Sequence, residues 1–508
     1  MKYVNALENE FNYKLTENGG LAHKSTCDAL YDLFALGGAY RKRSDEDCVF
    51  LFMKAFEENP TYAMKCLFYL RDILKGQGER RFFRVCIKWA ADNKTEAMRR
   101  NLRHIPEFGR WDDLYVFVGT ALEEDMWSFM GDQFVLDINS RTPSLLGKWL
   151  KSENTSSKES RALGAKTRKA FGLSSREYRV SLSRLRKRIN VLERLMSERR
   201  WDEIEFDKIP SKAGLIYKNA FARHDVERTR NKSVQTYEQF AKDKNTKVNA
   251  KALYPYEVVE KAINVFGGSY WRWSRNEVPL DDTNRLMVNK YWENLAEYIS
   301  KLDMNALCVV DTSGSMHGTP INIAISLGMI AADKAHGPFH GRYISFSSRP
   351  QLIKVEGVDF VDKVRRIYET NLCENTNLEA TFDMLLNVAR KNHMKQKDLP
   401  KSIIVISDME IDCAYGGYGW GSDQSAARAK NRTMMENMRH KWARAGYELP
   451  KMVYWNVDAR HDTFLDDGPD VTYVSGASAI LFEQIAKGVT AQDLMFEKLD
   501  SERYAKIK

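Results

Sequence analysis

One nine-residue segment constrains the fold of this chain more than any other. Residues 308–316 (CVVDTSGSM) run from an apolar stretch directly into one carboxylate and two hydroxyls at alternate positions. An apolar run bounded by turn residues predicts a buried strand of a parallel sheet, and open α/β sheets bind ligands beyond the carboxyl ends of such strands. Asp311, Ser313 and Ser315 stand at that end, so the segment predicts an α/β sheet with a polar site at its edge.

These three side chains suit a hard divalent cation. Mg²⁺ prefers oxygen ligands and keeps part of its water shell, so one carboxylate with neighbouring hydroxyls is a suitable set. The alternative is that Asp311 and the serines only cap the helix that follows, since Asp and Ser are favoured at helix N-termini.

The pattern D-x-S-x-S after an apolar strand resembles the metal-ion-dependent adhesion site of von Willebrand factor A domains. That family completes the site with a Thr from a second loop and an Asp from a third. Thr376 and Asp408 occur here in that order, and Asp408 directly follows the apolar run 402–407. The resemblance implies the ligand set Asp311, Ser313, Ser315, Thr376 and Asp408. It implies Mg²⁺, or another divalent cation such as Mn²⁺ or Ca²⁺, as the cofactor.

From about residue 304 to 488, candidate strands alternate with helical stretches. Such alternation predicts a doubly wound, mostly parallel sheet that is covered by helices on both faces. The expected strands are 306–310, 342–346, 351–355, 403–407, 451–456 and 471–474. The Gly-rich segment 415–422 predicts a loop beside the metal face.

The first 300 residues have a different pattern. Apolar residues recur at helical spacing, and breaks such as Gly37-Gly38 and Asn59-Pro60 separate helices of modest length. This pattern favours stacked helix pairs in a HEAT-like array. We therefore expect a multidomain α plus α/β chain with a HEAT-like helical domain over 1–300. A von Willebrand factor A domain over 301–490 and a helical tail over 491–508 would follow.

Positive charge is concentrated in one part of the helical half. Residues 141–200 hold 17 Lys and Arg against 5 Asp and Glu, a net charge of +12, whereas the whole chain carries +9. Within them an apolar helical stripe (Leu182, Leu185, Ile189) leaves most of the basic residues on the other side. Such a surface suits a phosphate backbone, although a solvated helix whose charges serve solubility is the alternative.

A helical array followed by a von Willebrand factor A domain resembles the Ro autoantigen ribonucleoproteins and their TROVE module. Segments 71–81 (RDILKGQGERR) and 105–114 (IPEFGRWDDL) are similar to a group of TROVE-like proteins of unknown function from eukaryotes and viruses. The resemblance implies a ring of HEAT-like helices and binding of small structured or misfolded noncoding RNA. The candidate RNA contacts rest on local charge and are Arg168, Lys169, Arg176, Arg179, Arg184, Arg186, Lys187 and Arg188.

We expect binding and not catalysis, because a hydrolase would usually add carboxylates for a second metal or a positioned base, and His317 is the only nearby histidine. A protein partner would offer an acidic side chain to the metal. The sequence also leads us to expect a cytoplasmic monomer without membrane segments. Two alternatives stay open: a metal-dependent protein adaptor that binds no RNA, and a phosphoesterase acting on nucleic acid.

Overall fold

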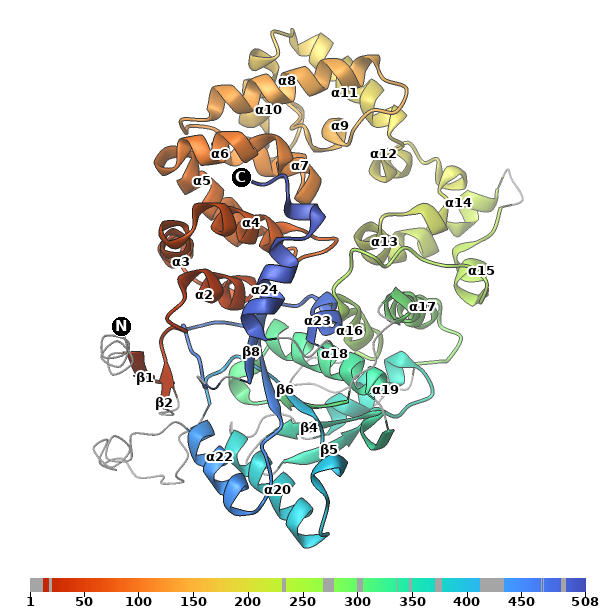
Figure 1. The fold of residues 1–508 in the computed structure, drawn as a ribbon. Helices are drawn as coiled ribbons and strands as arrows, with labels where there is room; N and C mark the ends of the chain where they lie inside the picture. Colours follow the sequence, from red (N-terminus) through yellow and green to blue (C-terminus); the bar gives the residue numbers. More distant parts are fainter. Residues whose placement is uncertain are drawn as a thin grey trace. The chain divides into compact units, whose positions relative to one another are not determined.

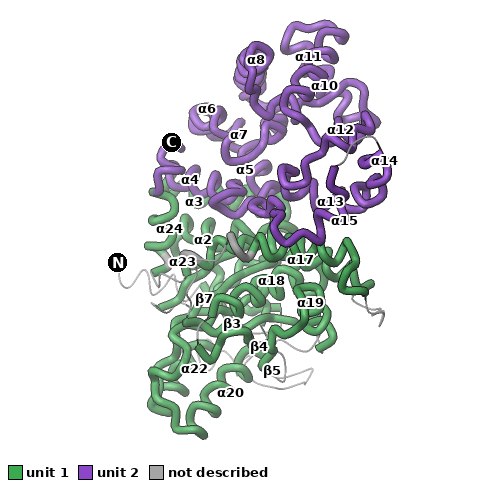
Figure 2. The backbone as a smooth tube through the Cα atoms, turned by 90° about the vertical axis from the view of Figure 1, so that its right-hand side faces the viewer, with its two compact units in different colours: residues 1–59, 253–500 green, residues 60–252, 501–508 purple. Residues whose placement is uncertain are grey.

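The chain forms two compact units, each described here by itself. The computed structural model describes residues 12–17, 21–230, 234–267, 278–298, 305–335, 337–346, 350–370, 377–411, 434–466, 468, 470–485 and 490–508. Unit 1 comprises residues 1–59 and 253–500, and unit 2 comprises residues 60–252 and 501–508 (Figure 2). The helices expected in a single domain up to residue 300 are therefore divided between the two units.

A six-stranded sheet in the order β5-β4-β3-β6-β7-β8 forms the centre of unit 1. Five strands are parallel, and β5 pairs antiparallel with β4 at the edge. The strands are β3 (Ala306–Asp311), β4 (Arg342–Phe346), β5 (Gln351–Lys354), β6 (Ser402–Ser407), β7 (Lys451–Asn456) and β8 (Val471–Ser475). All six expected strands are present to within one residue, so the predicted mostly parallel sheet is confirmed.

Helices cover both faces of this sheet, with α16 and α18 on one side and α20 and α22 on the other (Figure 1). Their bounds are α16 (Pro255–Val265), α17 (Thr283–Tyr298), α18 (Thr319–Lys334), α19 (Phe360–Glu369), α20 (Leu378–Lys391), α22 (Met434–Arg444), α23 (Phe482–Ile485) and α24 (Ala491–Leu499). Helix α18 is buried along most of its length because it packs between the sheet and α16. A Cβ on Gly328 would come within 2.6 Å of Val310 Cγ2 on β3, so glycine permits this close approach.

The N-terminal segment of the chain also belongs to unit 1. It contains a hairpin of β1 (Tyr13–Leu15) and β2 (Leu21–His23), followed by α2 (Ala29–Leu36) and α3 (Asp45–Glu58). His23 and Phe464 exchange backbone hydrogen bonds of 2.8 and 3.0 Å, and the Gly38 amide donates to Ser475 Oγ at 3.1 Å. Residues 12–39 therefore pack against the loop after β7 and the carboxyl end of β8.

Unit 2 is helical, and its described residues form no strand. Its helices are α4 (Pro60–Arg71), α5 (Arg80–Asn93), α6 (Thr95–Asn101), α7 (Ile105–Phe108), α8 (Glu123–Asn139), α9 (Leu146–Trp149), α10 (Lys158–Ala170), α11 (Ser175–Arg188), α12 (Leu192–Ser197), α13 (Ser211–Arg223), α14 (Asp225–Thr229) and α15 (Tyr237–Lys242). A helical N-terminal region is thus confirmed. None of the helices in the described part of the chain is long and apolar enough to cross a membrane.

Residues 501–508 belong to unit 2, whereas α24, which precedes them in the chain, belongs to unit 1. Tyr504 is fully buried, lies against the rings of Phe108 and Tyr69 with centroids 5.5 and 6.0 Å away, and donates its hydroxyl to Asp72 at 3.0 Å. Arg503 forms an ion pair with the same buried Asp72. The segment therefore completes the core of unit 2 around α4 and α7.

Candidate metal centre and nucleic-acid interface

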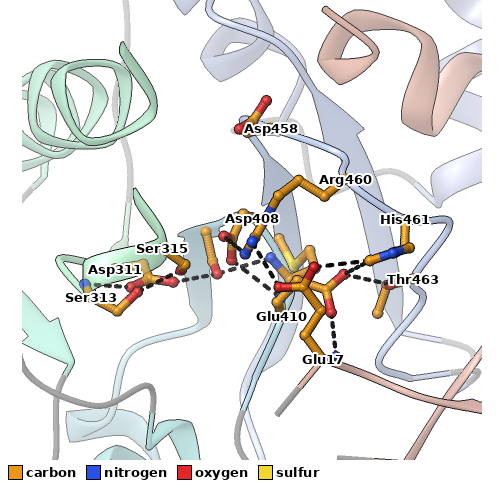
Figure 3. A network of polar contacts seen from close by, with 12 residues as sticks. Glu17, Asp311, Ser313, Ser315, Asp408, Glu410, Asp458, Arg460, His461 and Thr463 are labelled. Atoms are coloured by element: carbon orange, nitrogen blue, oxygen red, sulfur yellow. Dashed lines mark hydrogen bonds and ion pairs between the residues drawn. The ribbon is translucent and has the colours of Figure 1, made fainter. Parts of the chain in front are cut away.

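Two buried carboxylates stand at the carboxyl ends of neighbouring parallel strands. Asp311 is the last residue of β3, and Asp408 comes directly after β6. The register pairs Val310 with Ile406, which places both carboxylates at the same edge of the sheet (Figure 3). Asp311 and Asp408 are 0 % and 1 % exposed. The structure thus brings together the two acidic members of the predicted ligand set.

The two predicted serine ligands lie beside Asp311. The Ser313 amide donates to Asp311 Oδ1 at 2.9 Å, and the hydroxyls of Ser313 and Ser315 are 3.0 Å apart. Ser407 Oγ donates to the other oxygen, Asp311 Oδ2, at 2.6 Å. The loop after β3 therefore directs one carboxylate and two hydroxyls to one point, which is the donor chemistry that a hard divalent cation prefers.

Burial raises the pKa of Asp311 to about 7, and the charge of Asp408 adds to the effect. A second negative charge is therefore disfavoured at this edge of the sheet, and a bound divalent cation would offset both causes. Within the described residues, no three His, Cys, Asp or Glu side chains are grouped so that they could hold a metal. A cation here would thus depend on hydroxyl oxygens and water, and the residues present fit such a site.

Arg460 is a charged neighbour that the sequence pattern did not indicate. Its guanidinium donates to Asp408 Oδ2 at 2.7 Å and forms an ion pair with Glu17 at 2.7 Å (Figure 3). Asp408 therefore already has a cationic partner, whereas the carboxylate of Asp311 is held by a hydroxyl and an amide.

A second buried acid, Glu410, extends the network away from the strands. Glu410 is fully buried and accepts hydrogen bonds from the Glu17 amide at 2.7 Å and from Thr463 Oγ1 at 3.2 Å. His461 Nδ1 lies 3.2 Å from the same carboxylate. Between the two acids, Met409 has a φ of +66°, a left-handed conformation that is costly for a side chain of this size. On either side of this turn the two acids contact different residues of the loop after β7: Asp408 contacts Arg460, and Glu410 contacts His461 and Thr463.

One expected ligand and one expected loop lie outside the described residues: Thr376 and the Gly-rich segment 415–422. Sequence reasoning missed Arg460, His461 and Thr463, although they follow β7 and so share the edge of the sheet where Asp311 and Asp408 lie. Their position shortly after an expected strand of the same parallel sheet could have indicated that they lie near the site. Glu17 has no comparable signal, because it reaches the site from the N-terminal segment.

The basic residues expected to contact RNA lie on α10 and α11 of unit 2. On α11, Tyr178, Leu182 and Leu185 are buried, and the opposite face is exposed. We call four residues of that face the basic strip: Arg176, Arg179, Arg184 and Lys187. None of their side chains hydrogen-bonds or pairs with any residue that the structure describes. Lys169 on α10 is likewise exposed.

The other three candidates hold the fold together. Arg186 donates to the carbonyls of Gly147 and Leu150 at 3.0 and 2.9 Å, so it fastens α11 to α9. Arg188 donates to carbonyls at the end of α8, the shortest bond being 2.7 Å to Ile138. Arg168 pairs with Glu153 at 2.8 Å. These guanidinium groups are therefore less available to a ligand than the basic strip.

Comparisons with known proteins give two matching family models, one for each part of the sequence. A domain of unknown function, DUF7788, matches residues 305–504, and a second, DUF2828, matches residues 16–177 and 144–303. An uncharacterised protein of Acanthamoeba polyphaga mimivirus is 29 % identical over 516 residues, which cover 93 % of this chain and 84 % of the viral protein.

Among solved structures, the Ro (RSR) protein of Deinococcus radiodurans is matched with a TM-score of 0.41 and 14 % identity. That alignment covers 91 % of this chain and all of the Ro chain. The DUF2828 match spans more than half of the sequence, and the chain belongs to the DUF2828 family of unknown function.

Proposed function

We propose that this chain is an RNA-binding scaffold that holds small structured noncoding RNA on unit 2. The observation that carries the proposal is the basic strip. With a helical rise of about 1.5 Å per residue, Arg176 and Lys187 are roughly 16 Å apart on one exposed face of α11. Free cations spread over that length suit successive phosphates of a nucleic-acid backbone, whose neutralisation releases counterions and drives binding.

Two acidic residues of the same region are already paired with arginines outside the strip, and a third caps α11. Glu153 pairs with Arg168, and Glu198 pairs with Arg194 and Arg200. Glu177 accepts hydrogen bonds from Ser174, where it caps the start of α11. Glu177 therefore remains a negative charge beside Arg176, whereas no described residue forms an ion pair with the four cations of the strip.

A gel-shift titration at two salt concentrations tests RNA binding. The probe is a structured RNA with a single-stranded tail, and the variant is R176E/K187E. We expect tight binding that weakens with salt, and we expect the variant to lose most of the affinity and to have a shallower salt dependence. The matched control, K88E/R100E, reverses two exposed charges on α5 and α6 that are likewise unpaired among the described residues. Equal losses in both variants would contradict a role for the strip.

We further propose that unit 1 holds a divalent cation through Asp311, Ser313 and Ser315, with Asp408 nearby and Thr376 expected to join them. When bound, the cation would supply an open coordination position that accepts an acidic side chain of a protein partner. Asp311 is held in place by Ser407 and the Ser313 amide, so its carboxylate is oriented in advance. We propose no covalent chemistry at this site.

Manganese binding, followed by electron paramagnetic resonance and calorimetry, tests the metal site without any partner. The D311A variant should lose Mn²⁺ binding and keep RNA binding. The control D470A removes an exposed carboxylate of the same unit and should bind Mn²⁺ like the wild type. Loss of both metal and RNA binding in D311A would contradict separate roles for the two units.

The remaining candidates are separated by the same experiments. Mn²⁺ binding without any salt-sensitive retention of RNA would favour a metal-dependent protein adaptor. Cleavage of the RNA that depends on Mg²⁺ would favour a phosphoesterase instead.

A further inference from the structure

A cavity of about 640 Å³ lies in unit 2 beside the basic strip. It is formed by α9, the loop at residues 152–154, α11 and α12, which neighbour one another in Figure 1. Arg179 belongs to the strip and also lines the cavity. A backbone that follows the strip would therefore pass the mouth of a cavity whose volume is in the range of small-ligand sites.

One wall of the cavity is the indole of Trp149, which is half-buried. The Arg110 guanidinium lies over this ring at 4.0 Å from its centroid, and two hydrogen bonds of 2.9 Å to Asp112 fix Arg110 in turn. The indole is thus held in one orientation before any ligand arrives. An aromatic ring held in this way can stack on another planar ring at a low cost in conformational entropy.

The polar groups of the cavity favour a neutral, planar ligand. Arg186 is engaged with backbone carbonyls, but the side chains of Asn154, Arg179 and Ser183 hydrogen-bond to no residue that the structure describes. Glu193 also lines the cavity; its carboxylate accepts a hydrogen bond from Tyr217, and Lys148 Nζ is 4.0 Å away. The Glu193 carboxylate would repel an acidic peptide, whereas it can accept a hydrogen bond from an amino group.

We infer that this cavity binds one unpaired nucleobase of an RNA whose phosphates lie along the basic strip. The base stacks on Trp149, free donors and acceptors meet its edge, and Glu193 favours a base with an exocyclic amino group. This inference rests on the proposed RNA-binding function. It requires the bound RNA to contain a single-stranded part, because a paired base within a helix cannot enter the cavity.

A fluorescent base in the RNA tail tests the inference. The probe is a hairpin RNA whose single-stranded tail carries 2-aminopurine, the fluorescence of which is quenched by stacking. Wild-type protein should quench it at one position of the tail. W149A should abolish the quenching and weaken binding of the tailed RNA roughly tenfold, while binding of the hairpin without a tail is unchanged. W149F keeps an aromatic ring and should retain most of the quenching.

Two further variants separate the cavity from the fold. W127A removes a half-buried tryptophan of α8 outside the cavity and should behave like the wild type. S183M, at an exposed position of α11, partly fills the cavity without changing charge and should reduce quenching. If RNA binds through the strip but no tail position is quenched, the inference is overturned and the proposed function stands. If no RNA binds at all, both are overturned.

The preference for an amino group is tested with the tail sequence. Cytidine carries an exocyclic amino group and uridine does not, so a cytidine tail should bind more tightly than a uridine tail. The E193Q variant replaces a pure acceptor by a group that can also donate, and should reduce this difference. Equal affinity of the two tails for the wild type would overturn the role of Glu193.

Discussion

Asp311 makes the stability of unit 1 depend on pH. Its carboxyl has a pKa of about 7 in the folded protein, above the usual value near 3.8, because of burial and the charge of Asp408. The folded state therefore binds this proton more tightly than the unfolded state, and stability falls as the pH rises from about 4 to about 7. Between pH 5 and pH 8, the free energy of unfolding of the chelator-treated wild type should fall by roughly 2 kcal/mol more than that of chelator-treated D311N. Denaturant unfolding at the two pH values measures the difference.

Added Mg²⁺ provides the control for this experiment. A cation bound at Asp311 offsets the repulsion, so Mg²⁺ should stabilise the wild type at pH 8 and leave D311N unchanged. Identical pH profiles for the two proteins would refute the assigned electrostatics.

At the same scale, the sequence predicted the side chains that follow β3 and β6 but not the charges around them. Asp311 and Asp408 could be predicted because each directly follows a continuous apolar run, and the ends of parallel strands lie at one edge of a sheet. Arg460 and Glu17 could not, because their pairing joins residues more than 400 positions apart. The acidic candidate ligands could thus be predicted from local sequence, whereas the residues that pair with buried charges are set by tertiary contacts.

Among the elements, α18 packs closely against β3 at Gly328. Glycine inside a helix usually costs about 1 kcal/mol relative to alanine. At Gly328, however, an added Cβ would come within 2.6 Å of Val310 Cγ2, so G328A should destabilise unit 1 by roughly 1–3 kcal/mol. At Gly131 in α8 the nearest atom is 3.7 Å away in Phe171, and G131A should stabilise unit 2 by about 0.5 kcal/mol. Thermal unfolding measures both changes: the melting temperature should fall in G328A and rise in G131A. Changes in the same direction in both variants would contradict this account.

Elements with a strong local pattern were predictable, and elements that depend on distant partners were not. The central strands β3 and β6 carry continuous apolar runs, and α11 carries an apolar stripe, so the hydrophobic pattern identified them. The hairpin β1–β2 is three residues long on each side and continues into a bridge with Phe464, so no local pattern marks it. For the same reason charge alone could not separate Arg186, which fastens α11 to α9, from Arg179, which is exposed.

At the scale of the whole molecule, residues 501–508 should be essential to unit 2. Tyr504 is fully buried against Phe108 and Tyr69, so Y504A should destabilise unit 2 by about 3 kcal/mol. The control K506A removes an exposed ion pair with Glu107 and should cost less than about 1 kcal/mol. Hydrogen exchange of the amides in α4 and α7 measures the change. Equal protection in Y504A and wild type would show that the segment is dispensable.

The interrupted course of the chain through the two units has a consequence for synthesis on the ribosome. Unit 1 begins before unit 2 and resumes after it, and unit 2 in turn needs Arg503 and Tyr504 to complete its core. Unit 1 therefore cannot finish folding before residue 500 has emerged, nor unit 2 before Tyr504 has emerged, and apolar faces of both stay uncovered until then. A chain of this design should depend on chaperones during translation more than one whose domains follow each other in sequence.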